Sequence, residues 1–280
     1  MRCAPRSGGA DVSVSSAAAA PLSERVGGPG AWRTLGRAAL RLIMFWWLVT
    51  GLIVATQRDA ITRSIAAVVA VALAAIGLRL VWRTRDDLSP RGAQVGFIGG
   101  AFLWVFVQTA FYGGWIIGPD LAIPASSGPS PWLAIHAIGA TAWNEAISLA
   151  ALGGCVAVAQ RNPVGWLTVG TFWGTDQLAK MNVFMGVANP GTHFLPEQLY
   201  FLIAYFGPQR NSLLLPVSVV VLALLAAWLF RRVFVDTQAF RREANALLAW
   251  LLALAALEHV MLGLPVSVPL WDVFLQARGS

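Results

Sequence analysis

The stretch "SIAAVVAVALAAIGLRLVW" at residues 64–82 decides the fold class, because it is apolar almost throughout and carries one charge, near its end. A helix needs about 20 such residues to cross the hydrocarbon core of a bilayer. Six further apolar segments lie near 38–56, 94–117, 131–159, 163–187, 215–230 and 243–264. We therefore predict an all-α, polytopic membrane bundle of about seven transmembrane helices.

The composition agrees with this fold class. The chain has 280 residues, of which 57% are hydrophobic and 12% charged, whereas soluble domains carry about 25% charged residues. The net charge of +7 does not indicate a nucleic-acid partner, because the arginines form short clusters between apolar segments, as in cytoplasmic loops. Membrane lipid is the partner that the composition predicts.

The arginines also predict an orientation, since cytoplasmic loops are enriched in Lys and Arg. With the N-terminus in the cytoplasm, 15 of the 19 arginines fall on the cytoplasmic side and 4 on the other. Seven spans then place the C-terminus in the periplasm.

The segments outside the spans differ in character. Residues 1–30, rich in Ala, Ser, Gly and Pro, are predicted to form a disordered N-terminal tail, and residues 31–280 a single transmembrane domain. Between the fifth and sixth spans lies "LPEQLYFLIAYF" (195–206), which is amphipathic and aromatic with a proline at its start. Such a segment favours a helix lying at the outer membrane surface.

Polar side chains inside apolar spans are expensive and mark candidate functional sites. With the predicted orientation nearly all of them lie in the outer half of the membrane, with Asn144 and Glu145 near the middle of the fourth span. The predicted intramembrane polar cluster comprises Gln108, Asn144, Glu145, Asp176, Lys180, Asn182, Glu258 and His259, and the external connection adds His193, Glu197 and Gln198.

Lys180 is the chain's only lysine, and it lies four residues after Asp176, a spacing that places both on one helix face. Its long stem allows a second contact, and Glu145, which has no basic residue in its own segment, is the expected partner. We also expect His259 to share a proton with Glu258 or to donate to Asn182. The alternatives are a purely structural Asp176–Lys180 pair, amides that only join helices, and a Glu258–His259 pair at the water interface.

Five motifs together suggest a family: "FWWLVTGLI" (45–53), "AKMNVFMGV" (179–187), "HFLPEQL" (193–199), "LLPVSV" (214–219) and "LEHVMLGLP" (257–265). They resemble the PuhE-type family, photosynthetic complex assembly protein 2 of purple phototrophic bacteria, from about residue 40 to about residue 275. The resemblance implies a multi-pass protein of the bacterial cytoplasmic or intracytoplasmic membrane, connected with reaction-centre assembly and bacteriochlorophyll supply.

The same resemblance implies a set of Glu and His residues on four segments, types that suit a two-metal site. Here Gln108, Trp143, Asn144 and Gln198 occupy positions where the family carries Glu or His. The remaining candidate metal ligands are Glu145, Glu197, Glu258 and His259. Because amides are poor ligands for transition metals, we expect no complete metal site. The cofactor that the resemblance implies is a bacteriochlorophyll-type tetrapyrrole, which the protein would contact.

The sequence thus favours a membrane assembly factor that binds pigment, reaction-centre or antenna subunits, or pigment-synthesis proteins, and leans against an enzyme. One alternative is a metal- or redox-dependent membrane enzyme acting on a tetrapyrrole or quinone. A second is a transporter with a polar relay through Glu145, Asp176 and Lys180.

Overall fold

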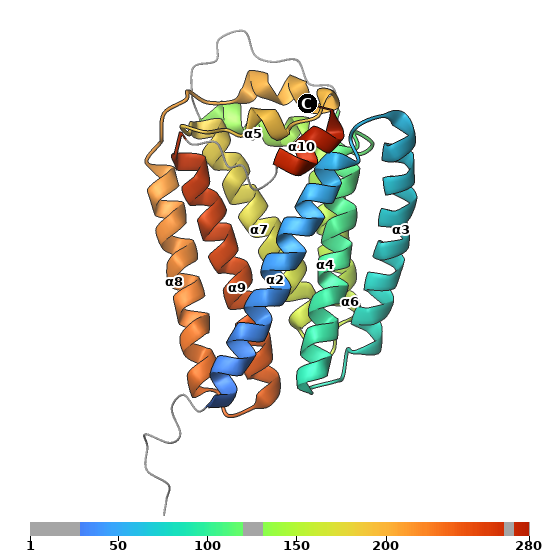
Figure 1. The fold of residues 1–280 in the computed structure, drawn as a ribbon, viewed down its shortest axis with the longest axis vertical. Helices are drawn as coiled ribbons and strands as arrows, with labels where there is room; N and C mark the ends of the chain where they lie inside the picture. Colours follow the sequence, from blue (N-terminus) through green and yellow to red (C-terminus); the bar gives the residue numbers. More distant parts are fainter. Residues whose placement is uncertain (1–28, 120–130, 266–271, 280) are drawn as a thin grey trace, which may run out of the picture.

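The computed structural model describes residues 29–119, 131–265 and 272–279, and every regular element within these ranges is a helix. Seven long helices run along the molecule, and four short ones gather at its upper end (Figure 1). The long helices are α2 (Pro29–Ala55), α3 (Ala60–Arg83), α4 (Pro90–Tyr112), α6 (Ala142–Val158), α7 (Val164–Met185), α8 (Leu214–Val235) and α9 (Ala239–Gly263). The short ones are α5 (Pro131–Ala140), η1 (Thr192–Phe194), η2 (Glu197–Tyr205) and α10 (Asp272–Arg278).

The chain is a multi-pass membrane protein by helix length and hydropathy. Among the described residues five helices are long and apolar enough to cross a membrane, namely α2, α3, α4, α8 and α9, and α5 with α6 makes a sixth if the bent pair is one span. The prediction of a multi-span, all-α protein is confirmed at this level. Helix α7 has the length of a span but is not among these candidates, so the predicted number of seven stays a prediction.

The predicted continuous helix over 131–159 is wrong. The chain bends by 73° between α5 and α6, and α5 lies across the upper end of the bundle (Figure 1). The connection after α4 lies beside the break. There the Asn144 N–H, which has no partner within the first turn of α6, donates to the Ile117 carbonyl at 3.0 Å. At Gly118 any Cβ would lie 2.1 Å from the Ala140 carbonyl oxygen.

This break changes the predicted depth of one acidic residue. Glu145 lies in the first turn of α6, rather than near the middle of a continuous span. The helix N-terminus there carries a partial positive charge that favours a carboxylate.

The boundaries of the other helices differ from the predicted ones by local chemistry. Helix α4 begins after the Ser89 cap with Pro90 in its first turn and ends at Tyr112, five residues before the predicted limit, because Gly113 and Gly114 follow and Gly114 takes a φ of +78°. Helix α2 already begins at Pro29, inside the segment predicted as a tail. The rest of that tail, residues 1–28, lies outside the described residues.

The segment predicted as a surface helix at 195–206 contains a 3-10 helix, η2, rather than an α-helix. A 3-10 helix repeats every three residues, and the buried Leu199, Leu202 and Tyr205 follow that spacing. Tyr200 and Phe201 on the other sides are exposed. Helix η2 lies across the same upper end as α5 (Figure 1).

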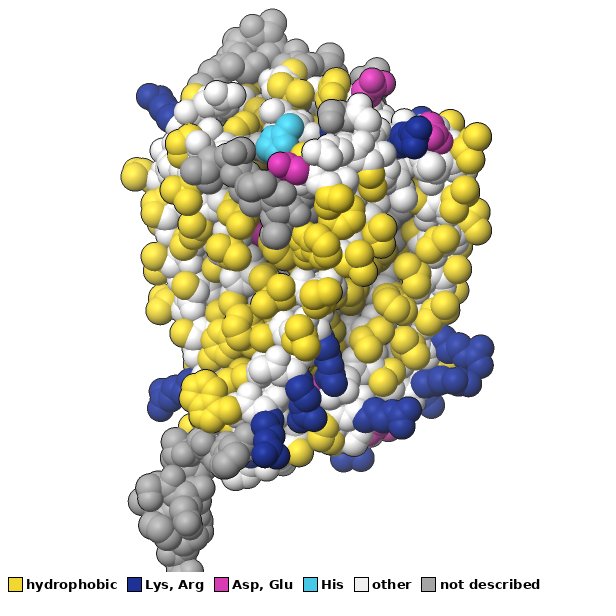
Figure 2. Space-filling model, in the orientation of Figure 1, with side chains coloured by type: hydrophobic (Ala, Val, Ile, Leu, Met, Phe, Trp, Pro, Cys, Tyr) yellow, Lys and Arg dark blue, Asp and Glu magenta, His cyan; other side chains and the backbone are white. Residues whose placement is uncertain are grey.

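Side-chain chemistry divides the surface into zones. In the face shown in Figure 2, hydrophobic side chains cover the middle, and most Lys and Arg side chains gather toward the lower end.

Inside the bundle, glycines let helices approach closely. A Cβ at Gly77 of α3 would lie 2.6 Å from the Gly99 carbonyl oxygen of α4, and a Cβ at Gly100 would lie 2.4 Å from the Gly165 carbonyl oxygen of α7. Helix α4 is thereby held between α3 and α7, which carries the lysine.

Candidate functional site

One face of α7 surrounds the carboxylate of Glu145. Trp173, Gln177 and Lys180 follow an i, i+4, i+7 spacing, which brings them to the same side of the helix. Trp173 Nε1 and Gln177 Nε2 donate to Glu145 Oε2 at 3.2 and 2.5 Å, and Lys180 Nζ donates to Oε1 at 2.7 Å. Glu145 is therefore a fully engaged acceptor that fastens α6 to α7.

Lys180 also joins this carboxylate to a second one. Its Nζ lies 2.9 Å from Asp176 Oδ2 and 5.2 Å from the centre of the Phe111 ring. The Lys180 and Glu145 side chains are each 12% exposed, and the other oxygen of Asp176 accepts from Gln108 Nε2 at 3.3 Å. We call the chain Glu145, Lys180, Asp176 and Gln108, which links α6, α7 and α4, the lysine network.

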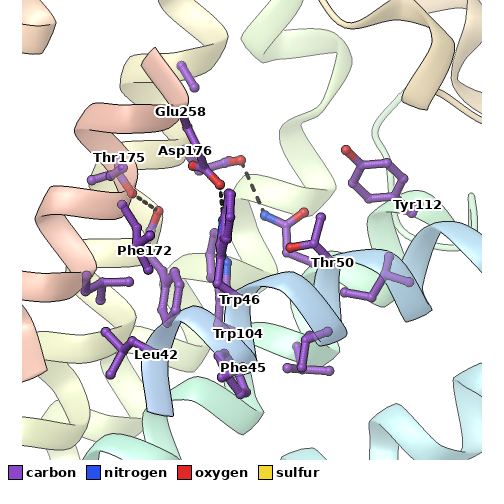
Figure 3. Close-up of a pocket in the computed structure, with 18 of the residues that line it drawn as sticks. Leu42, Phe45, Trp46, Thr50, Trp104, Tyr112, Phe172, Thr175, Asp176 and Glu258 are labelled. Atoms are coloured by element: carbon purple, nitrogen blue, oxygen red, sulfur yellow. Dashed lines mark hydrogen bonds between the residues drawn. The ribbon is translucent and has the colours of Figure 1, made fainter. Parts of the chain in front are cut away.

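The lysine network borders a cavity of about 240 Å³ between α2, α4, α7 and α9. Figure 3 shows Asp176 and Glu258 close together in its lining, with aromatic side chains around them. Trp104 and Phe172 stack with ring centres 5.6 Å apart and an angle of 6° between the rings. The side chains that give the cavity its character are Phe45, Trp46, Trp104, Phe172, Gln108, Tyr112, Asp176 and Glu258.

Glu258 and His259 have different surroundings. Glu258 lines the cavity and accepts from the indole N–H of Trp46 (Figure 3). His259 is buried, and its Nδ1 lies 2.8 Å from the Ala255 carbonyl. The structure does not show the expected proton sharing between the two: consecutive residues of a helix point about 100° apart, and His259 Nε2 has no hydrogen-bond partner among the described residues.

The amides predicted for the cluster mostly join helices. Asn182 does not meet His259; its Nδ2 donates to the Leu178 carbonyl and to Ser218 Oγ of α8, both at 2.8 Å. Asn144 is 2% exposed, and within the part of the chain that the structure describes its side-chain oxygen has no hydrogen-bond partner. Neither side chain is among those that line the cavity.

Gln198 fixes the connection between α7 and α8. Its Oε1 accepts from Arg63 Nη1 at 3.0 Å, and its Nε2 donates to Gln57 Oε1 at 3.2 Å and to the Tyr112 carbonyl. This one amide ties η2 to the α2–α3 turn and to the end of α4, where the Tyr112 side chain lines the cavity. Glu197 opens η2 one residue earlier.

His193 lies beside the C-terminal helix. Arg278 of α10 donates to the His193 carbonyl at 2.7 Å and to the Phe194 carbonyl at 2.9 Å. Partial burial, and then the charge of Arg278, lower the pKa of the His193 imidazole below its usual value, while Asp272 opposes the shift.

The candidate metal ligands do not come together. Glu145 is held by donors from α7, Glu258 by Trp46, and His259 by a backbone carbonyl. Across the described ranges no group of three or more His, Cys, Asp or Glu side chains is placed to hold a metal ion. The arrangement instead suits hydrogen bonding to a ligand that is otherwise apolar.

Sequence reasoning missed three donors that complete the site, namely Trp46, Trp173 and Gln177. The spacing of Trp173, Gln177 and Lys180 on one helix face was visible in the sequence and could have identified two of them. Trp46 could not be identified in this way, because its partner Glu258 lies 212 residues away.

Comparisons with known proteins identify the family of this chain but no solved relative. A family described as a protein of unknown function, DUF3623, matches residues 33–280. A Rhodobacter capsulatus protein described as an uncharacterized 30.4 kDa protein in the puhA 5′ region is 32% identical over 248 residues, covering 85% of this chain and 89% of the relative. No solved structure matches the chain significantly. With most of its length matched by the family, the chain belongs to DUF3623.

Proposed function

We propose that this protein is an integral membrane assembly factor of the bacterial photosynthetic apparatus, which holds the apolar ring or isoprenoid chain of a pigment or quinone between α2, α4, α7 and α9. The process is supported by the relative from the puhA 5′ region and by the motifs of the PuhE-type family. The membrane of action is then the cytoplasmic or intracytoplasmic membrane of a bacterium.

The observation that carries the proposal is the aromatic cavity with its acidic lining. Trp46, Trp104 and Phe172 offer flat apolar surface, and Asp176 and Glu258 offer hydrogen-bond acceptors. Its volume of about 240 Å³ is below the roughly 300–1,000 Å³ of pockets that enclose a drug-sized molecule. The cavity therefore suits one ring or a length of chain, and a tetrapyrrole macrocycle attached to that chain would remain outside it.

The lysine network maintains one wall of this cavity. Asp176 faces the cavity from α7, and its charge is balanced by Lys180, which Glu145 holds from the opposite side. Burying these charges is tolerable because each has a partner. The network therefore fixes how α7 stands against α4 and α6, and with it the distance across the cavity.

A seven-span topology follows the same proposal. The five single spans, the α5–α6 pair and α7 together make seven crossings, with α7 lying among the other long helices in Figure 1. The placement of the start of α2 at the lower end and of the C-terminus at the upper end in Figure 1 supports an odd number of crossings. The arginine-rich lower end is then cytoplasmic and the C-terminus periplasmic.

The function is tested by filling the cavity in the living host. Ala179 lines the cavity, so Ala179→Trp places an indole in the ligand's space. Val217→Trp, at an exposed position of α8, introduces the same side chain on the outer surface of the bundle. In a strain that lacks the gene, wild type and Val217→Trp should restore reaction-centre absorbance, and Ala179→Trp should not. Full restoration by Ala179→Trp at normal protein levels would refute the proposal.

A transporter with a polar relay is the second candidate, and the continuity of the lysine network favours it. Glu145, Lys180, Asp176 and Gln108 form an unbroken chain of contacts that ends at the cavity. Vesicles containing the purified protein distinguish the two functions: a relay would dissipate an imposed pH gradient, and Asp176→Asn would stop it. An assembly factor would leave the gradient intact.

A further inference from the structure

A second hollow, at the opposite end of the molecule from the short helices, combines arginines with apolar surface. It has a volume of about 870 Å³ and lies between the last turns of α3 and the end of α6. Arg79, Arg83 and Arg85 line it, as does Asp86, which gives the site a net charge of +2 (three minus one). In Figure 2 the Lys and Arg side chains gather at this end, including a group at the lower right.

Two of these arginines have no ion-pair partner among the residues that the structure describes. Arg85 pairs with Asp86 at 3.5 Å and stands over the Trp82 ring at 5.8 Å. Arg79 and Arg83, one helical turn apart and both exposed, form no ion pair or side-chain hydrogen bond within the described ranges. Two free guanidinium groups at one helix end are a ready site for a phosphate, which guanidinium binds through paired hydrogen bonds.

The rest of the lining is apolar, as expected for a surface that faces lipid. Leu78 and Trp82, 41% and 57% exposed, alternate with the arginines along α3, and Val158 closes the site from α6. Arg79 lies four residues before the end of α3, about 6 Å inside the helix end, a depth from which an arginine reaches outward to headgroups. Trp82 suits the same depth, because tryptophan is enriched at the interface between the hydrocarbon and the headgroups.

The turn that carries Arg85 is held in place before any ligand arrives. Asn162 is 3% exposed, and its Nδ2 donates to the Thr84, Asp87 and Gly92 carbonyls at 3.0–3.2 Å. The Arg85 carbonyl in turn accepts from the N–H groups of Arg161 and Asn162, both at 2.8 Å. A rigid frame lowers the ordering cost of binding.

We infer that this hollow, the α3–α6 arginine site, binds an anionic phospholipid, with the phosphate between Arg79 and Arg83 and an acyl chain against Ala75, Leu78 and Val158. A lipid fits the site better than a soluble phosphate because the apolar half of the site can bind an acyl chain. The inference is independent of the proposed function, because the site is separate from the aromatic cavity and from the lysine network.

The test measures the affinity of the detergent-purified protein for added lipid. Native mass spectrometry follows lipid binding during titration with phosphatidylglycerol or phosphatidylcholine. Each basic residue beside an anionic lipid contributes about fivefold in affinity. The double variant Arg79→Gln/Arg83→Gln should therefore bind phosphatidylglycerol about thirtyfold more weakly. Arg231→Gln/Arg241→Gln, which removes the same charge from the α8–α9 end, should lose less than about threefold. Equal losses in the two double variants, or none in the first, would overturn the site.

Two further arms separate a lipid from a free phosphate. Ala75→Trp fills the apolar half and leaves every arginine in place, so it should weaken phosphatidylglycerol binding even if the arginine variant fails to fold. Unchanged binding by Ala75→Trp overturns the chain placement. Millimolar inorganic phosphate should not displace the lipid from the wild-type protein, and displacement would show a simple phosphate site instead.

Discussion

Replacing Lys180 with methionine should destabilise the protein strongly. The change removes the ammonium group that lies 2.7 Å from Glu145 and 2.9 Å from Asp176, and it leaves two carboxylates without their cation. Breaking a buried ion pair by deleting one partner costs about 3–5 kcal/mol. The lost hydrogen bond to Glu145, at about 1.5–3 kcal/mol for a charged partner, accounts for part of this figure, and the lost ion pair with Asp176 for the rest.

The lower part of that range is the better expectation. The Asp176 side chain is 23% exposed, so solvent or headgroups recover part of its lost interaction. A loss of about 3 kcal/mol, at about 2–4 °C per kcal/mol, lowers the apparent melting temperature by roughly 6–12 °C. The measurement is thermal unfolding of the protein in nanodiscs, followed by tryptophan fluorescence.

A second substitution identifies the cause. Glu145→Gln in the Lys180→Met background removes one uncompensated charge but keeps an oxygen that can accept from Trp173, so it should restore about half of the loss. Lys180→Arg, which retains the charge, should lose less than Lys180→Met. The reasoning is refuted if Lys180→Met melts within about 1 °C of wild type, or if Glu145→Gln deepens its loss.

Three further expectations follow from the packing. Gly118→Ala should cost about 1–3 kcal/mol in thermal unfolding, because its Cβ would meet the Ala140 carbonyl at 2.1 Å; Gly153→Ala, with nothing within 4 Å of its Cβ, should be neutral or stabilising, and equal effects would contradict the packing. Asn162→Ala should cost about 3 kcal/mol by the same assay, since three carbonyls lose their donor, and a neutral result would show that the turns hold without it. The pKa of His193 is lowered in the folded protein, so the unfolded chain binds the proton more readily, and the stabilisation from neutral His193 is full above about pH 6.5 and is lost as the pH falls through the folded pKa. His193→Asn should therefore reduce the change in melting temperature between pH 7 and pH 5. An unchanged pH dependence would exclude His193 as the cause.

The sequence predicted what depends on local pattern. The uniform apolar runs of α3 and α8 indicate membrane helices by their length and hydropathy. The i, i+4 spacing of Asp176 and Lys180 placed them on one face, and the lack of a basic residue near Glu145 pointed to Lys180 before any helix packing was known. Whether this network serves binding is still a prediction.

What depends on distant residues could not be predicted. The apolar sequence across residues 131–159 does not predict the 73° angle of its break, which is accompanied by the close approach of Gly118 and the hydrogen bond to the Ile117 carbonyl. Gln198 stood out only as a replacement for a family histidine, whereas the structure shows an amide that joins three segments. Hydrogen-bond partners of this type follow from the tertiary fold and not from sequence spacing.

Occupancy of the aromatic cavity tests the central claim most directly. The wild-type protein, Ala179→Trp and Val217→Trp are purified from their phototrophic host membranes in parallel, and the small apolar molecules extracted from each are quantified by mass spectrometry. The account predicts a pigment or quinone with an isoprenoid chain at about one per protein in wild type and Val217→Trp, and its loss from folded Ala179→Trp. The same molecules in the same amounts in all three proteins would contradict it.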